Sequence, residues 1–417
     1  MPFRFRLSPI PRQPGVSDRV VRLSLLGRFT DEVFSGLFDV LMPSIRASLG
    51  FSYAQIGLLS LVLNYVAAVV EPIHGLLIDV WQRHRLLAWG AAGTGISVVV
   101  MGIAPGYFVL LAGFAIYGLA SGPLAHTADV VLVEAHPEAP GRIYARATLL
   151  DTVGALLAPV LVTAGIWAGL DWRWIIAGVG VWGPIYAVLL LRTRFPSPLG
   201  AHREGEAEDG SERVPLIEAF RRNLRAALSS RTAVLWLLFL FAHDVLDSPL
   251  PLRTVWLVDE VGMSQGTVGV YTAFELTVSL AAVAYLDRWL RRSSPRVILG
   301  IAVAGLLVLY PAWFAVPGIA AKFAIGLPLQ VLLAVLWPIA QGELLSSVPG
   351  RAGALTALRS LFGFVPLTVL VGLLAESQGL TITMASFHVA GLAVMAFAVL
   401  RLPQGARPSE VGAAPDG

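Results

Sequence analysis

Cysteine is absent from the 417 residues of this chain. Its absence excludes disulfides, thiolate metal sites and cysteine nucleophiles. Lysine is almost absent, since only Lys322 is present and Ala321 precedes it. A phosphate-binding P-loop needs Gly, then Lys, then Ser or Thr, so the chain cannot supply such a loop for ATP hydrolysis. We therefore expect no cofactor.

Charge is also scarce. Charged residues make up 14% of the chain, against roughly 25% in soluble domains. Hydrophobic residues make up 56%, and the mean hydropathy is +0.74. A soluble globule cannot bury that much apolar surface, so lipid is the expected solvent. The composition therefore predicts an all-α integral membrane protein.

Apolar runs close to the roughly 20 residues that span a bilayer occur twelve times. They are Leu23–Ile45, Ile56–Ile78, Leu86–Ile103, Tyr107–Val133, Ala145–Leu170, Trp174–Leu191, Thr232–Trp256, Val268–Leu286, Val297–Val316, Ala320–Leu345, Ala352–Leu374 and Thr381–Leu400. This pattern predicts a tail (1–22), a six-helix bundle (23–191), a linker (192–231), a second six-helix bundle (232–401) and a second tail (402–417).

Arginine distribution predicts the orientation, because cytoplasmic loops of membrane proteins are enriched in Arg and Lys. With the N-terminus placed in the cytoplasm, only Arg46, Arg173 and Arg253 fall outside. Arg28, Lys322 and Arg359 fall within helices, and the other 24 of the 30 basic residues fall inside. We expect both termini in the cytoplasm and a location in the cytoplasmic (inner) membrane. The pI of about 9.4 then reflects topology, and no nucleic-acid partner is expected.

Three sequence features of the first half recur in the second half at a nearly constant offset. The pairs are Ser52 and Gly57 with Ser264 and Gly269 (offset 212), Asp79 and Arg83 with Asp287 and Arg291 (offset 208), and Pro-Gly-Arg at 140–142 with the same triplet at 349–351 (offset 209). Such a repeat predicts two parallel six-helix bundles with a cavity between them, which is the architecture of a transporter.

The loop after the second apolar run resembles a motif of the major facilitator superfamily, Gly-x-x-x-Asp-(Arg)-x-Gly-Arg-(Arg/Lys). Gly75, Asp79, Arg83 and Arg85 match it, while Val80 and Gln82 stand at its intervening Arg and second Gly. The stretch 171–174, Asp-Trp-Arg-Trp, is similar to another common stretch of the family. The stretch 52–57, Ser-Tyr-Ala-Gln-Ile-Gly, is similar to the fosmidomycin-resistance-type branch. This resemblance covers all twelve helices and implies transport by alternating access.

Drug:proton antiporters of the family carry Arg-x-x-Gln-Gly in the fourth helix, and the aligned stretch 114–118 lacks that arginine.

In the loop motif, the resemblance implies a gate in which Asp79 pairs with arginines of the neighbouring bundle. The gating residues would be Gly75, Asp79, Arg83, Arg85 and their repeats Asp287 and Arg291. The alternative is a basic anchor at the cytoplasmic surface with an incidental aspartate.

Ionisable residues within membrane spans are costly and mark a pathway by default. Arg28, Glu32, Ser35 and Asp39 follow 4-3-4 spacing and share one helix face. Asp31 lies beside this face and is spaced to pair with Arg28. A structural ion pair of Arg28 with Asp31 or Glu32 is the alternative to a pathway.

Ten carboxylates but only three basic residues lie within the predicted spans. They cannot all be ionised in a low-dielectric interior, so some are expected to carry protons and others to hold a cationic solute. His243 and Asp247 share a face at i, i+4. The predicted substrate and proton pathway comprises Asp31, Glu32, Asp39, Asp151, His243, Asp244, Asp247, Glu275 and Arg359.

These features favour a monomeric secondary transporter that exports a small amphipathic or cationic compound in exchange for protons. A proton-coupled importer or facilitator of a metabolite is the alternative. An intramembrane hydrolase is disfavoured, because His-Glu-x-x-His is absent and the residues around Ser121 miss Gly-x-Ser-x-Gly. His126 and Asp129 have half of a metal site's spacing but no third ligand, so no metal is expected.

Overall fold

A computed structural model describes residues 16–136, 140–195, 228–290, 292–347, 358–359 and 364–403, which form helices and no strand. The first half contains α1 (Asp18–Leu49), α2 (Tyr53–Val80), α3 (Arg83–Gly102), α4 (Tyr107–Ala135), α5 (Pro140–Trp167), α6 (Trp172–Gly180) and α7 (Trp182–Leu191). The second half contains α9 (Arg231–Asp247), α10 (Leu250–Asp259), α11 (Gln265–Leu290), α12 (Pro295–Ala315), α13 (Ile319–Ser346), α15 (Leu367–Gln378) and α16 (Leu380–Arg401).

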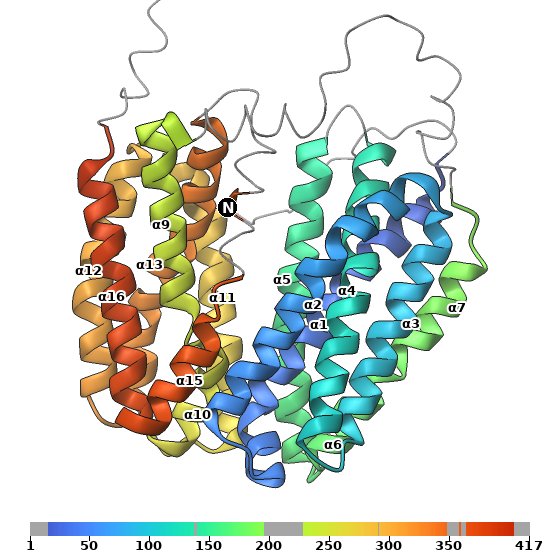
Figure 1. The fold of residues 1–417 in the computed structure, drawn as a ribbon, viewed down its shortest axis with the longest axis horizontal. Helices are drawn as coiled ribbons and strands as arrows, with labels where there is room; N and C mark the ends of the chain where they lie inside the picture. Colours follow the sequence, from blue (N-terminus) through green and yellow to red (C-terminus); the bar gives the residue numbers. More distant parts are fainter. Residues whose placement is uncertain are drawn as a thin grey trace, which may run out of the picture. The chain divides into compact units, whose positions relative to one another are not determined.

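Contacts divide the chain into two compact units. Unit 1 comprises Met1–Leu41 and Val62–Asp209, and unit 2 comprises Met42–Leu61 and Gly210–Gly417. The division therefore falls within α1 and α2, whose connecting turn has its contacts in unit 2. Within unit 1, α3 packs along α4, α6 and α7; within unit 2, α9, α12, α13 and α16 lie side by side (Figure 1).

Ten described segments have the length and hydropathy to cross a membrane. In two of them a crossing is built from two consecutive helices, α6 with α7 and α9 with α10. The acidic and basic side chains of α1 lower its hydropathy, and α15 has only 12 residues. The predicted run Ala352–Leu374 is described only in part, and the helix seen there begins at Leu367 and extends to Gln378.

The repeated serines begin the second helix of each half. Ser52 Oγ accepts a hydrogen bond from the backbone N–H of Gln55, whose side chain accepts from Ser52 N–H in return. Ser264 Oγ likewise accepts from the backbone N–H of Thr267. Such caps satisfy N–H groups that the first turn of a helix leaves without partners. The sequence repeat therefore has a local physical cause, helix initiation.

Close helix approaches depend on small residues. A Cβ at Gly154 of α5 would lie 2.6 Å from the carbonyl oxygen of Phe29, and one at Gly36 of α1 would lie 2.8 Å from the Cβ of Ala158. These two glycines let α1 and α5 pack closely in unit 1. Asp151, one turn before Gly154, is consequently held beside α1.

Lys322, the single lysine, is 2% exposed near the start of α13. Its ammonium donates hydrogen bonds to the carbonyl oxygens of Trp313 and Val316 at the end of α12. It also lies 5.0 Å from the ring centroid of Trp256. A cation is favoured at the C-terminal end of a helix, where carbonyl groups lack partners. Lys322 therefore caps α12.

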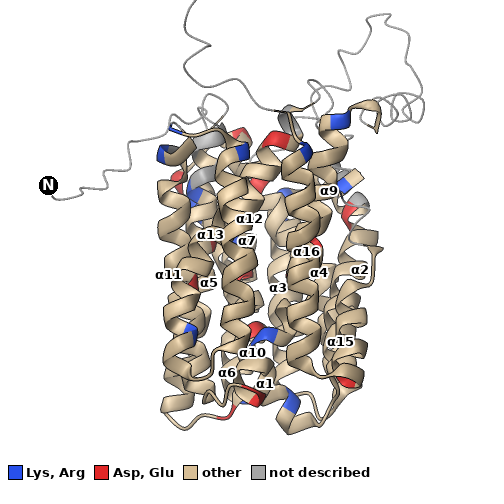
Figure 2. Cartoon of the chain, turned by 90° about the vertical axis from the view of Figure 1, so that its left-hand side faces the viewer, with Lys and Arg blue, Asp and Glu red and all other residues tan. Residues whose placement is uncertain are grey.

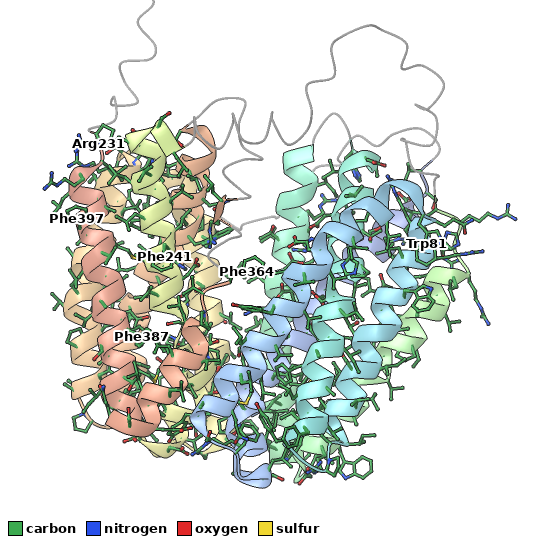
Figure 3. The ribbon with its side chains drawn as sticks, in the orientation of Figure 1. Trp81, Arg231, Phe241, Phe364, Phe387 and Phe397 are labelled. Carbon is green, nitrogen blue, oxygen red and sulfur yellow. The ribbon has the colours of Figure 1, made fainter. Side chains whose placement is uncertain are left out.

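The outer surfaces of the helices suit lipid. Phe397 projects from α16 and is 50% exposed (Figure 3). Trp167 at the end of α5 and Trp174 at the start of α6 are both more than 70% exposed. Aromatic residues at helix ends are typical of a membrane–water interface. Charged residues gather towards the two ends of the helices, with few between (Figure 2).

Candidate substrate and proton pathway

Arg28 joins three helices of unit 1. Its guanidinium donates to both carboxylate oxygens of Asp151 on α5, at 3.2 and 2.5 Å, and to Asp129 on α4 at 3.4 Å. The three side chains are 17%, 10% and 19% exposed. One arginine thus neutralises charge from two acids that the sequence separates by 22 positions.

Asp31 has its partners on α4, whereas its spacing predicts a partner on its own helix, α1. Its carboxylate accepts hydrogen bonds from Tyr117 and Ser121 of α4, each at 3.0 Å. The expected i, i+3 pair with Arg28 is therefore replaced by hydroxyl donors, while Arg28 reaches across to α5. Sequence reasoning missed both hydroxyls as partners of Asp31; their one-turn spacing on α4 was the available signal.

The next turns of α1 carry Glu32, Ser35 and Asp39, which we call the α1 acid face. Ser35 and Asp39 are exposed and Glu32 is partly exposed. Among the described residues, none forms a hydrogen bond or ion pair with the Glu32 carboxylate. The shared face predicted from 4-3-4 spacing is present, and its two acidic side chains are accessible beside α1.

Unit 2 also holds an ion pair that joins its first helix to a later segment. Asp244 on α9 accepts from both terminal nitrogens of Arg359, at 3.0 and 3.3 Å. Arg359 lies 208 positions after Asp151, close to the repeat offsets. In unit 1 the first helix carries the arginine; in unit 2 the first helix carries the aspartate. Asp244 lies 216 positions after Arg28, outside the repeat offsets of 208–212, so only Arg359 and Asp151 correspond in the repeat.

His243 directly precedes Asp244 on α9. Its Nδ1 lies 3.2 Å from Asp247, as their i, i+4 spacing predicts. His243 is 11% exposed and Asp247 is 50% exposed. α9 ends at Asp247, and Pro249 prevents it from continuing into α10. Figure 3 labels Arg231, the first residue of α9, and Phe241 on the same helix. The predicted single helix over 232–256 is therefore interrupted beside this pair.

Arg253 on α10 lies 2.8 Å from Glu275 on α11, and Glu275 is 4% exposed. The sequence predicts Arg253 on the outer side of the membrane; within unit 2 its side chain is 21% exposed and reaches Glu275. The two residues line a pocket together with Asp247, Tyr310 and His388. A buried acid that needs a counter-charge was the signal available in the sequence.

The loop motif is described in part. Arg83 is 4% exposed and donates two hydrogen bonds to Glu134 at the end of α4, while Arg85 is exposed. Gly75, Asp79 and Asp287 lie on described helices, but their side chains fall outside the described part of the structure, and so does the whole of Arg291. Gating by these residues stays a prediction, and Arg83 has a partner that the motif does not name.

The turn between α1 and α2 is held within unit 2 by polar contacts. Arg46 donates to Asp259 at 2.7 Å, and Tyr53 donates to the same oxygen at 3.2 Å. Glu376 on α15 accepts from the backbone N–H of Ala54 at 2.9 Å. We call these residues the turn clasp. They attach the first turn of α2 to α10 and α15.

Metal ligands do not gather in the described ranges, where no group of three or more His, Asp or Glu side chains is arranged to hold an ion. His126 lies 3.5 Å from Glu71 instead. The arrangement is that of a helical protein with ion pairs and acids inside each unit.

Comparison with known proteins identifies the family. The family model for the Major Facilitator Superfamily matches residues 24–369, so the chain belongs to that superfamily. No curated protein sequence matches the chain. The chain is thus a transporter of this fold and not an enzyme. The fosmidomycin-resistance-type branch is not confirmed.

Solved structures show the same fold. A bacterial homologue of the human lysosomal transporter Spinster, in an inward-facing and unoccupied conformation, is 18% identical with a TM-score of 0.67; the match covers 92% of this chain and 94% of that one. The nucleoside transporter NupG is 13% identical with a TM-score of 0.71, over 92% and 98% of the two chains. These likenesses show the fold alone.

Proposed function

We propose that the protein is a proton-coupled exporter of a small amphipathic or cationic organic compound in the cytoplasmic membrane, with both termini in the cytoplasm. The observation that carries the proposal is the α1 acid face. Glu32 and Asp39 are accessible on α1, within the run 23–45 that the sequence predicts to cross the membrane, and a charge kept at such depth is costly unless it is used.

Competition between a proton and a cation supplies the coupling. A carboxylate that has released its proton attracts a cationic solute, whereas the protonated acid does not. Solute and proton therefore exclude one another at the same oxygens, which is the thermodynamic requirement for exchange. Aromatic residues of unit 1 near this face, Phe34 and Phe38, are buried and pack within the unit, so the acids are the groups offered to the solute.

The test uses tetraphenylphosphonium as the probe cation. Binding of radiolabelled probe to the purified protein should weaken about tenfold in Glu32→Gln or Asp39→Asn, a change of about 1.4 kcal/mol. It should also weaken as the pH falls, since protonation removes the same charges. Glu260→Gln is the control, because Glu260 is an exposed acid at the end of α10.

Equal probe binding by all four proteins would refute the role of the α1 acid face. Binding that strengthens at acidic pH would contradict the competition. Uptake driven by the entry of protons, in the same direction as the protons, would show that the alternative function, proton-coupled import, is the correct one.

A further inference from the structure

The pocket inside unit 2 is small, and ionisable groups lie among its apolar side chains. It is bounded by α9, α10, α11, α12, α13 and α16, and offers roughly 30 Å³ to the centres of water-sized molecules. That is room for about two waters. Organic ligands need pockets of roughly 300 Å³ or more, so this pocket does not admit the transported compound.

An exposed acid and a buried acid lie at this pocket. Asp247 is 50% exposed and Glu275 only 4% exposed. Both line the pocket. The interruption between α9 and α10 leaves backbone groups there without helical partners, and such breaks within a membrane occur where the backbone borders water or a polar site. Water in the pocket would connect the two acids by hydrogen bonds.

We propose that Glu275 is a buried proton-binding residue of unit 2, that the more exposed Asp247 takes up the proton first, and that pocket water carries it from Asp247 to Glu275. This deepens the proposed function, on which it rests for the role of the proton, because it assigns the proton a site apart from the α1 acid face. The ligand of this pocket is the proton itself.

The proton balance is simple. Asp247 as a carboxylic acid gives up its proton to pocket water, and water passes a proton to the carboxylate of Glu275. Asp247 becomes a carboxylate, and Glu275 becomes a neutral acid. The ion pair between Glu275 and Arg253 is lost, so the pair changes from neutral to a net charge of +1. The guanidinium of Arg253 then attracts the charged Asp247, which lines the same pocket.

The groups that face Glu275 come from five helices. Arg253 on α10 supplies the positive charge, and Tyr271 lies one turn away on α11. Tyr310 on α12 and His388 on α16 close the pocket beside Asp247 on α9. His388 Nδ1 lies 2.6 Å from the carbonyl oxygen of Met384, to which it can only donate, and its ring packs against Tyr310.

Infrared spectroscopy of the purified protein tests the proposal without any solute. During an acid titration, the C=O stretching band of a protonated, buried carboxyl group should appear in the wild type and in Glu260→Gln. The component of this band that Glu275 contributes should be missing in Glu275→Gln. In Asp247→Asn the band should reach full height, but after a rapid pH drop it should appear at least tenfold more slowly.

A band unchanged in Glu275→Gln overturns the assignment, and an unchanged rate in Asp247→Asn overturns the route. If Glu275→Gln does not fold with Arg253 unpaired, Arg253→Gln/Glu275→Gln removes both charges together and should also lack the band. Failure of the proposed export would appear in probe flux and not in these spectra. A present band with no proton-driven flux would therefore leave the proton site standing while the export function falls.

Discussion

Replacing Arg28 by methionine should destabilise the protein strongly, because it removes the partner of two acids that remain largely buried. Arg28 makes two hydrogen bonds to Asp151 and a longer one to Asp129. Hydrogen bonds to charged groups contribute about 1.5–3 kcal/mol each. Breaking a buried ion pair costs about 3–5 kcal/mol. With side chains 10–19% exposed, we expect a loss of about 3–4 kcal/mol.

Thermal unfolding in detergent, followed by tryptophan fluorescence, measures this loss. The charge exchange Arg28→Asp/Asp151→Arg is the matched variant, because it places opposite charges at the same two positions again. It should recover at least half of the lost stability. Wild-type stability of Arg28→Met would refute the reasoning, and so would an exchange variant less stable than the single variant.

Three further substitutions test local parts of the account. Lys322→Met should destabilise the protein by about 2–3 kcal/mol, because it removes charged hydrogen bonds to the end of α12. In the folded wild type, the Lys322 amine should react with amine-directed dyes far more slowly than the N-terminus. Equal reaction rates would contradict its burial. Ser52→Ala should cost about 1 kcal/mol of stability through loss of the cap on α2, and a neutral effect in thermal unfolding would contradict that role. Asp259→Asn should weaken the turn clasp and speed labelling of a cysteine introduced at Leu49, a partly buried residue at the end of α1, in a chain that otherwise has no cysteine. Unchanged labelling would show that the contact does not hold the turn.

Features set by local sequence were predictable. The apolar runs give the helices, the serine caps mark where α2 and α11 begin, and i, i+4 spacing places His243 beside Asp247. Each of these depends on residues a few positions apart. The twofold repeat was also readable, because the same caps and loops recur in both halves. Together these features were sufficient to indicate the family.

Partners that lie far apart in the sequence were not predictable. Arg28 pairs with Asp151 because α1 and α5 approach at Gly36 and Gly154, which spacing along α1 cannot reveal. Arg253 pairs with Glu275 because α10 continues inward after the break at Pro249. In both cases, helix packing decides which acid an arginine meets. The division at 191/192 and 231/232 stays a prediction, since 196–227 falls outside the described residues.

The most direct test of the central claim measures whether a proton gradient drives solute movement. Proteoliposomes loaded with tetraphenylphosphonium, with the membrane potential clamped by potassium and valinomycin, are given pH gradients of either sign. The account predicts that the probe leaves against its own gradient while protons enter, that it stops leaving when the pH gradient is reversed, and that a protonophore abolishes the effect. Probe movement that ignores the sign of the pH gradient would contradict proton-coupled export.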